Sequence, residues 1–317
     1  MTHSHPSDLE PRPAGRPRSR TRTALRWTGR VLAAVVALVL VAAGAVYGLS
    51  ERRLHARFAL PEHPLAVRDD PAAVARGKYL TNTRGCTDCH GANLGGNVMI
   101  DDPVIGRLAG PNLTRGGRGA ALSDREWELA VRHGLRKDGS ALMIMPSQEF
   151  TGMTDADLAA IVAYARSLPS VATAQPASQA GPIPRVMFVA GKMDLIAAEV
   201  VDHRAAHLAN VEVASTVEYG GYVAKGCTGC HGPGFSGGKI PGAPPDWDPA
   251  ANITPTGIGK WSEADFVHAM RTGLRPDGSR ISDKTMPLKM IGAMDDVELQ
   301  AIYRYLRTVP ARASGNR

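Results

Sequence analysis

A five-residue pattern, C-x-x-C-H, occurs twice in this chain and constrains its fold more than any other feature of the sequence. Residues 86–90 read CTDCH and residues 227–231 read CTGCH, an offset of 141 positions. Shorter matches follow each copy in the same order, at offsets of 139 to 141. They pair residues 112–114 with 252–254, 134–140 with 273–279, 145–146 with 286–287, and 153–155 with 294–296. A repeat of this length indicates two copies of one domain.

Each copy is predicted to be mainly helical. Apolar residues recur at helical spacing before each motif, in residues 71–81 and 216–224. Ser123 and Ser262 each precede an acidic residue by three positions, which is typical of a capping box at a helix start. An amphipathic segment that ends at a proline is predicted to close each copy as a helix, over residues 155–168 and 295–309. The expected fold class is therefore all-α.

The C-x-x-C-H pattern predicts covalent attachment of c-type haem. Its two thiols add to the porphyrin vinyl groups, and the adjacent histidine reaches the iron from the same segment. Zinc sites and thioredoxin-like redox pairs also use C-x-x-C, but neither needs a histidine directly after each motif or a matched methionine downstream. The sequence therefore predicts two covalently attached haem c groups. The predicted attachment residues are Cys86, Cys89, Cys227 and Cys230, and the predicted proximal iron ligands are His90 and His231.

The sixth iron ligand is predicted to be a methionine in each copy. Met145 and Met286 each lie 55 residues after the histidine of their own motif, and each directly precedes a proline. Methionine opposite histidine is the ligation typical of electron-carrying cytochromes. A methionine near an apolar cofactor can also be simple core filling. We expect that role for the other nearby methionines, although the last two named here also repeat at a spacing of 63 residues: Met143, Met290, Met153 and Met294.

These residues resemble the class I c-type cytochromes, and more narrowly the membrane-bound dihaem proteins that accept electrons from periplasmic dehydrogenases or feed respiratory oxidases. The resemblance covers roughly residues 70–170 and 215–310. It implies two tandem class I cytochrome c domains after one N-terminal transmembrane helix. In each domain it implies an N-terminal helix that crosses the closing helix. The residues expected at these crossings are Gly77, Tyr79 and Tyr164 in the first domain, and Gly220, Tyr222 and Tyr305 in the second.

The resemblance also implies a loop carbonyl that accepts a hydrogen bond from the proximal imidazole N–H and so orients the ring. Pro111 is the candidate in the first domain. Ala251 aligns with it in the second, which departs from the pattern but still supplies a carbonyl.

An uncharged apolar run over residues 31–49 is about as long as a bilayer core requires. Arginines precede it, so the positive-inside rule predicts a cytoplasmic N-terminus and haem domains on the periplasmic face of a bacterial inner membrane. The alternative is a signal peptide cleaved near residues 43–45, although this run is longer than a usual signal-peptide core. The expected divisions are a basic N-terminus (1–30), a transmembrane helix (31–49), a linker (50–70), cytochrome c domain 1 (71–170), an inter-domain linker (171–213), cytochrome c domain 2 (214–311) and a tail (312–317).

The basic character of the chain belongs to its N-terminus. Residues 1–30 carry a formal charge of +5 and residues 31–57 carry +2, which together account for the whole net charge of +7. The remainder is near neutral and gives no support for nucleic-acid binding.

The inter-domain linker contains a segment that could form a helix and a pair of closely spaced histidines. Residues 193–201 are expected to form a short helix packed over a domain. His203 and His207, four residues apart, could share one helical face and bind a metal. Because the sequence identifies no further ligand beside them, we expect a solvated face instead.

The expected function is electron transfer without a small-molecule substrate and without catalytic acid–base residues. No cysteine remains after the two motifs, which excludes a cysteine-ligated haem enzyme. The expected partners are a dehydrogenase, an oxidase, or a soluble cytochrome or copper protein. A peroxidase-like dihaem enzyme and a haem-based sensor stay open as alternatives, because both need an iron with an exchangeable ligand.

Overall fold

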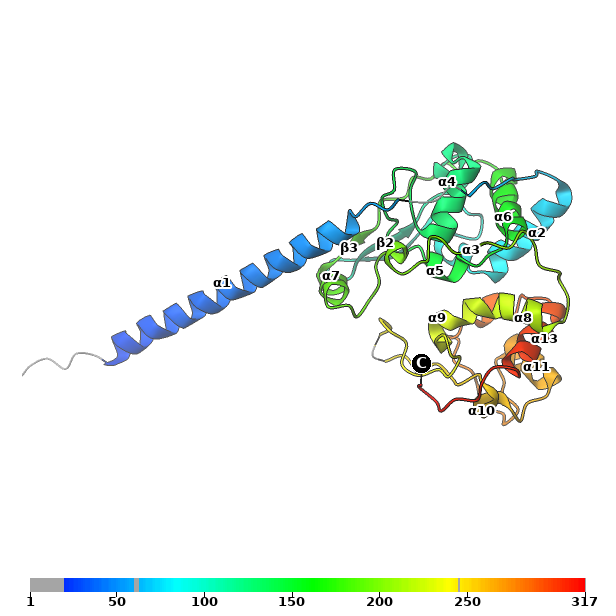
Figure 1. Cartoon of the computed structure of the whole chain (residues 1–317). Helices are drawn as coiled ribbons and strands as arrows, with labels where there is room; N and C mark the ends of the chain where they lie inside the picture. Colours follow the sequence, from blue (N-terminus) through cyan, green and yellow to red (C-terminus); the bar gives the residue numbers. More distant parts are fainter. Residues whose placement is uncertain (1–19, 60–62, 245, 317) are drawn as a thin grey trace, which may run out of the picture. The chain divides into compact units, whose positions relative to one another are not determined.

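The computed structural model describes residues 20–59, 63–244 and 246–316, and Figure 1 shows their helices and strands. Most of the predicted basic segment 1–30 lies outside the described residues. The chain divides after Gly48 into two units, which are treated separately below.

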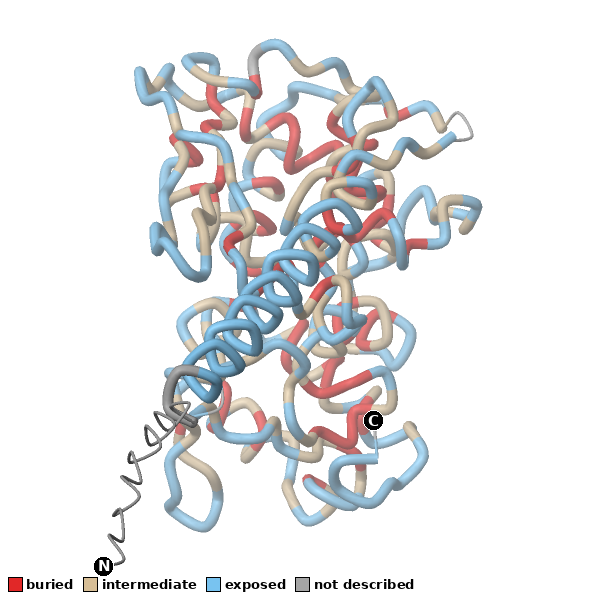
Figure 2. The backbone as a smooth tube through the Cα atoms, turned by 90° about the vertical axis from the view of Figure 1, so that its left-hand side faces the viewer, coloured by how far each residue is buried: buried red, intermediate tan, exposed pale blue. Residues whose placement is uncertain are grey.

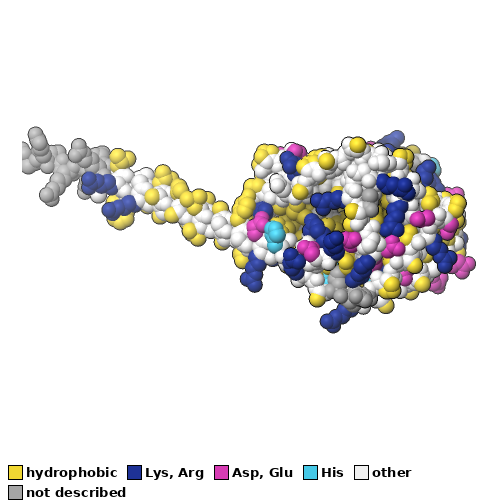
Figure 3. Space-filling view, turned by 90° about the horizontal axis from the view of Figure 1, so that it is seen from above, with side chains coloured by type: hydrophobic (Ala, Val, Ile, Leu, Met, Phe, Trp, Pro, Cys, Tyr) yellow, Lys and Arg dark blue, Asp and Glu magenta, His cyan; other side chains and the backbone are white. Residues whose placement is uncertain are grey.

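The first unit contains most of α1 (Arg20–Leu54), a helix of 35 residues. Within Thr23–Leu54, the most apolar stretch of 18 residues has a mean hydropathy of 2.5, and none of that stretch is buried. Figure 2 shows this exposure along the helix, and Figure 3 shows hydrophobic side chains covering it beyond a basic start. Because about 20 apolar residues cross a bilayer core, α1 is long enough to be a membrane anchor or the apolar part of a signal sequence.

The second unit contains both copies of the repeat, and the predicted, mainly helical fold is confirmed. Copy 1 contains α2 (Pro71–Thr83), α3 (Cys86–His90), η1 (Arg118–Ala121), α4 (Asp124–Glu128), the π-helical turn η2 (Leu129–His133), α5 (Ser147–Phe150) and α6 (Asp155–Ser167). Copy 2 contains α8 (Val217–Val223), η4 (Ala224–Cys227), α9 (Thr228–His231), α10 (Pro255–Ile258), α11 (Glu263–Thr272), α12 (Leu288–Ile291) and α13 (Asp296–Leu306). Both predicted capping boxes are present, at the starts of α4 and α11.

The N-terminal helix of each copy crosses the closing helix, as the resemblance implied. α2 packs on α6, and α8 packs on α13. A glycine makes each crossing possible, since a Cβ atom at Gly77 would lie 1.9 Å from the Ala160 carbonyl oxygen. A Cβ atom at Gly220 would lie 1.9 Å from the carbonyl oxygen of Ala301. The two glycines therefore occupy the point where the helix backbones approach most closely.

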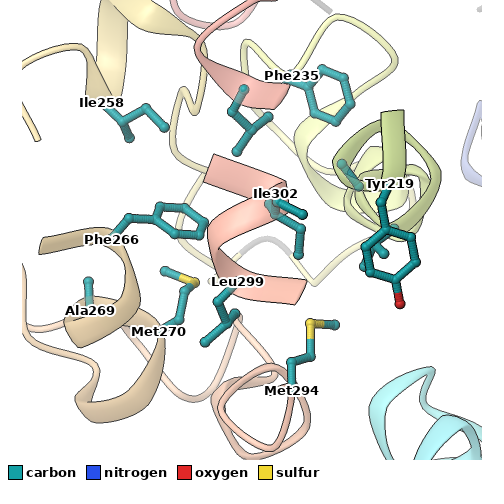
Figure 4. Close-up of a cluster of buried hydrophobic side chains, with 13 residues drawn as sticks. Tyr219, Phe235, Ile258, Phe266, Ala269, Met270, Met294, Leu299 and Ile302 are labelled. Atoms are coloured by element: carbon teal, nitrogen blue, oxygen red, sulfur yellow. The ribbon is translucent and has the colours of Figure 1, made fainter. Parts of the chain in front are cut away.

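Each copy has its own apolar core. In copy 1 the core includes the fully buried Leu80 and Leu158, with Trp127 beside them. In copy 2 Phe266 of α11 lies beside Leu299 and Ile302, which form part of the buried face of α13, as Figure 4 shows.

The segment between the copies is folded rather than extended. It contains β3 (Gln179–Ala180), α7 (Pro182–Val189) and the 3₁₀ turn η3 (Ala197–Glu199). The short helix expected over residues 193–201 is thus wrong in position: only η3 forms there, and the helix lies earlier, at α7. A third apolar cluster, which includes Leu135, Phe188 and Ile196, packs this segment against copy 1.

The sequence did not predict a small antiparallel sheet that follows the first C-x-x-C-H motif. β1 (Asn97–Asp102) pairs with β2 (Gly106–Gly110), with Asp102 opposite Gly106, and β3 extends the order to β1-β2-β3. The sheet holds the start of the inter-copy segment against the loop that follows the first C-x-x-C-H motif.

Candidate functional site

Both C-x-x-C-H motifs form short helical turns. The first forms α3, and the second spans the end of η4 and all of α9. Residues three apart share one side of a helical turn, so this conformation presents both thiols of a motif together. The four cysteines form no disulfide. Burial raises the pKa of Cys86 and of Cys227 to about 12, so both thiols are protonated near neutral pH when nothing is bound to them.

The histidine of each motif is buried and held by a loop carbonyl. The Nδ1 atom of His90 lies 2.9 Å from the carbonyl oxygen of Pro111, and that of His231 lies 2.7 Å from the carbonyl oxygen of Ala251. The Pro111 prediction is confirmed, and Ala251 makes the same contact. Because a carbonyl oxygen only accepts, Nδ1 carries the proton and Nε2 keeps a lone pair for a metal. Burial lowers the pKa of His90 although the Pro111 hydrogen bond opposes this, so the ring is favoured in its neutral form.

The loop after each motif has the same backbone geometry in both copies. Gly91 and Gly232, directly after the histidines, have φ values of 81° and 78°, which glycine adopts without strain. Three residues later, Leu94 and Phe235 have φ values of 55° and 57° and are buried. A bulky residue rarely adopts a positive φ, and such strain persists where the surrounding structure enforces it. The repeat therefore preserves an enforced turn beside each histidine.

A cavity lined by residues of both copies brings the predicted site residues of copy 2 together. Its empty space, with the open mouth included, is about 830 Å³. Cys227, Cys230, His231 and Met286 all line it. Seven of the fourteen remaining lining residues are apolar: Phe150, Met153, Val223, Pro287, Met290, Ile291 and Met294. The polar ones are Thr83, Arg84, Glu149, Tyr222 and Lys225. An apolar lining beside two thiols, an imidazole and a thioether suits haem c, so the donor set fits that group.

Three methionines of copy 2 line this cavity in different ways. Met294 is buried within the core of copy 2 (Figure 4). Met290 reaches copy 1, because its Sδ atom lies 3.2 Å from the position of a Cβ atom on Gly85. Met286 is partly buried and lies in the loop before α12.

In copy 1 Met145 also lies at the edge of the core. It packs against the buried cluster of that copy, of which Met153 is a member. Ile144, directly before Met145, has a φ of 64°. A β-branched residue in this region is a conformational outlier that the surrounding structure has to hold in place.

The two copies meet through a reciprocal exchange of tyrosines. The Tyr79 hydroxyl of copy 1 donates to Glu298 on α13 (2.8 Å) and accepts from the Asp295 N–H (2.8 Å). The Tyr222 hydroxyl of copy 2 donates to Asp157 on α6 (2.7 Å) and accepts a backbone N–H at the start of that helix (3.3 Å). Each copy thus inserts a tyrosine at the N-terminus of the other copy's closing helix.

Two arginines of copy 1 complete this contact. Arg84 donates to both carboxylate oxygens of Glu298, at 3.1 and 2.6 Å. Arg76 donates to Asp157 at 3.0 Å and to the Tyr219 hydroxyl at 3.3 Å. Burial alone raises the pKa of Glu298, but Arg84 and the tyrosine hydroxyls outweigh it and hold that pKa below its usual range.

This inter-copy network was not predicted from the sequence. The tyrosines were expected at helix crossings within each copy, and no role was expected for the two carboxylates. Asp157 and Glu298 are the third residues of their helices, where an acidic residue usually serves the helix start itself. Their matched positions, 141 residues apart, were the one available signal.

Comparison with known proteins agrees with the duplicated geometry. The sequence model of the cytochrome c family matches residues 74–169 and again residues 220–310. The chain belongs to the cytochrome c family. Membership of the cytochrome c family implies covalently bound haem c and haem-based electron transfer.

Several relatives in the cytochrome c family are similar along most of the chain. The cytochrome c subunit of the quinone-dependent alcohol dehydrogenase of Gluconacetobacter polyoxogenes is 30% identical over 76% of this chain and 57% of its own length. The fructose dehydrogenase cytochrome subunit of Gluconobacter japonicus is 27% identical over 80% of this chain and 56% of its own length. The gluconate 2-dehydrogenase cytochrome c subunit of Pantoea cypripedii is 26% identical over 78% of this chain and 62% of its own length. The chain therefore matches little more than half of the length of these relatives.

Proposed function

We propose that this chain is the electron-carrying cytochrome subunit of a membrane-bound dehydrogenase and that it holds two haem c groups. One is attached at Cys86 and Cys89 with His90 and Met145 on the iron. The other is attached at Cys227 and Cys230 with His231 and Met286 on the iron. When bound, haem c supplies one-electron oxidation and reduction.

The observation that carries this proposal is the duplicated geometry of the two motifs. In each copy a buried histidine turns Nδ1 to a loop carbonyl, which leaves Nε2 for iron, and a matched methionine follows at the same spacing. Because each copy offers its own sixth ligand, we infer that both irons are closed to small molecules. A closed iron suits electron transfer rather than substrate activation.

Met286 and Met145 are proposed as the iron ligands because of where each candidate methionine lies in the fold. Met294 and Met153 are buried in the cores of their copies, and Met290 lies against the other copy at Gly85. Met286 and Met145, at the core edges, remain available for iron. The strained φ of Ile144 supports the same choice in copy 1, since enforced backbone conformations concentrate at functional sites.

The proposed partner is a dehydrogenase that delivers electrons, because the similar proteins are cytochrome subunits of alcohol, fructose and gluconate dehydrogenases. We infer that α1 anchors the chain and that both haem-binding copies lie on the periplasmic side. The acceptor would be an oxidase or a soluble cytochrome or copper protein.

The ligand assignment is tested with methionine variants of the full chain in detergent. Met286→Ala and Met145→Ala should each keep two covalent haems per chain but lose one of the two sulfur-to-iron charge-transfer bands. Met290→Ala is the matched control, because Met290 lines the same cavity, and it should keep both bands. A chain with fewer than two haems, or with the band lost in Met294→Ala instead of Met286→Ala, would contradict the assignment.

The carrier role is tested on the unaltered chain. Reduced protein should bind carbon monoxide slowly and substoichiometrically, and it should exchange electrons with a soluble cytochrome without turning over any small substrate. Fast stoichiometric carbon monoxide binding at one haem, together with peroxide reduction, would replace the carrier role with an enzymatic one.

A further inference from the structure

Four histidines gather beside copy 1, and none of them belongs to the proposed haem sites. The ring of His133 lies 5.1 Å from that of His203 and 5.9 Å from that of His207, centroid to centroid. The ring centroid of His63 lies 4.8 Å from that of His207. These residues come from three separate parts of the chain, so the fold brings them together.

The helix after the first motif contributes a buried carboxylate to this cluster. Glu128 is fully buried, and its Oε1 atom lies 3.0 Å from Nε2 of His133. The two residues are five apart, and the π-helical turn η2 between them places them on one face. Copy 2 has a regular α-helix here, α11, with Val267 and Thr272 at the matching positions. The pair is therefore a property of copy 1 alone and is not required by the repeated fold.

The hydrogen bonds of the cluster fix where its protons lie. His203 Nε2 lies 3.0 Å from the Ala198 carbonyl oxygen, which can only accept, so this nitrogen carries the proton. In the neutral His203 ring, Nδ1 is then the acceptor. The facing Nδ1 atom of His133, at 3.0 Å, must then be the donor. His133 Nε2 and the Glu128 carboxylate consequently need a proton or a metal cation between them.

His207 supplies a third ligand atom. Its Nδ1 atom is buried and has no hydrogen-bond partner among the described residues. A ring nitrogen of His207, a carboxylate oxygen of Glu128 and a ring nitrogen of His133 all lie within 4.8 Å of one another.

The expectation of a solvated helical face for His203 and His207 is wrong. Residues 200–210 form no helix, and both histidines are partly buried. The Asp202 side chain accepts the backbone N–H of Arg204, a local turn that competes with helix formation. The further ligands that the sequence could not identify are Glu128 and His133.

We propose that Glu128, His133 and His207 bind one divalent transition-metal ion of the zinc class, separately from the haem sites. Two imidazoles and a carboxylate form a ligand set that such ions accept, and a fourth position stays open to water. His203 accepts the other ring N–H of His133 and orients it, as outer-shell partners of metal-bound histidines do. Arg125 holds the second oxygen of Glu128 at 2.7 Å.

The neighbouring charges are compatible with a bound cation. Arg125 and Arg132 are the nearby positive groups that would oppose it. Arg125 is paired with Glu128 at 2.7 Å, and Arg132 is paired with Asp155 at 2.7 Å. Asp155 also lies 3.0 Å from His63. The bound metal would fix the inter-copy segment, because residues directly after His207 accept the backbone N–H groups of Asp155 and Ala156 at the start of α6.

The test uses the full haem-loaded chain in detergent, carrying a purification tag without histidine. The protein is stripped with a chelator, and zinc binding is measured by equilibrium dialysis, with zinc and iron quantified together. One zinc per chain should bind. His207→Ala and Glu128→Gln should weaken binding at least tenfold, and His203→Ala should weaken it about 10–100-fold through loss of the orienting partner. His268→Ala, which removes an exposed histidine from α11, is the matched control and should bind as the unaltered chain does.

Haem absorption and far-ultraviolet circular dichroism check that each variant is folded. If His207→Ala misfolds, His207→Asp, which keeps a ligand, should retain binding while His203→Ala still weakens it. Equal zinc affinity in all variants, or no bound zinc in the unaltered chain, would overturn the proposal and leave a proton between His133 and Glu128. Haem content and charge-transfer bands should not change in any variant, so failure here is distinguishable from failure of the electron-transfer role.

Discussion

Replacing Arg84 with methionine should strongly destabilise the folded chain, because the buried carboxylate of Glu298 loses its main ion-pair partner. Glu298 has no exposed surface, and Arg84 is only 11% exposed at its side chain. Methionine fills similar space but removes both charge-assisted hydrogen bonds to this carboxylate. Breaking a buried ion pair by removing one partner typically costs about 3–5 kcal/mol. Because the two tyrosine hydroxyls and Arg76, at 3.9 Å, still face Glu298, we expect a cost near the lower end, about 3 kcal/mol.

The assay is urea unfolding of the full chain in detergent, followed by circular dichroism and haem absorbance. Adding Glu298→Gln to Arg84→Met should recover part of the loss, because the uncompensated charge is removed; a double-mutant cycle measures this coupling. Arg304→Met is the matched control, since its Arg–Glu pair with Glu263 is exposed, and it should shift the midpoint far less. If Arg84→Met shifts the midpoint no more than Arg304→Met does, the reasoning from a buried charge is wrong.

The same pair predicts a pH dependence. The pKa of Glu298 in the folded state is held below its ordinary value. The ionised carboxylate therefore contributes fully to folding stability above the unfolded-state pKa of about 4.3, and this contribution is lost as pH falls through the folded-state pKa. In Arg84→Met burial prevails and the pKa of Glu298 should rise. The stability difference between the two proteins should therefore be largest at neutral pH and should shrink as the pH approaches 4. A difference that is constant from pH 7 to pH 4 would contradict this assignment of charge.

Two further predictions concern the helix crossing and the anchor. Gly220→Ala should destabilise copy 2 by about 1–3 kcal/mol, because its Cβ atom would meet the Ala301 carbonyl. Gly44→Ala in α1, where nothing lies within 4 Å of the added Cβ atom, should change the thermal midpoint little. Carbonate washing should leave the chain in the membrane, and N-terminal sequencing should find an intact start; a soluble chain that begins between about residues 44 and 60 would show cleavage of a signal peptide instead.

The sequence could predict the features that the repeat and local chemistry determine. The two capping boxes follow from residues that are close in sequence, and the C-x-x-C-H motifs are matched between copies. The glycines at the helix crossings and the loop carbonyl at Pro111 were implied by the resemblance to class I c-type cytochromes, and Ala251 is the residue that aligns with Pro111. Local rules predict such features because no distant contact competes with them.

The features that sequence reasoning missed depend on contacts between distant segments. β1 contains mostly exposed residues, so it lacks the half-buried alternation that marks a strand, and its pairing with β2 and β3 decides its conformation. The third apolar cluster forms only when the inter-copy segment folds back on copy 1. Glu128 and His133 acquire a shared face only through a π-helical turn, which a period of 3.6 residues does not predict.

The interface between the copies also predicts how the proposed haems influence one another. Arg84 lies two residues before Cys86 and also lines the cavity that contains Cys227, and its charge lowers the pKa of both thiols against the larger effect of burial. A positive charge in this position favours the reduced, more electron-rich state of both sites. Arg84→Met should therefore lower both reduction potentials, Glu298→Gln should raise both, and Arg304→Met should change neither. Redox titration of the full chain measures these shifts. If Arg84→Met moved only one potential, its charge would act on one site alone, and the two sites would not share this control.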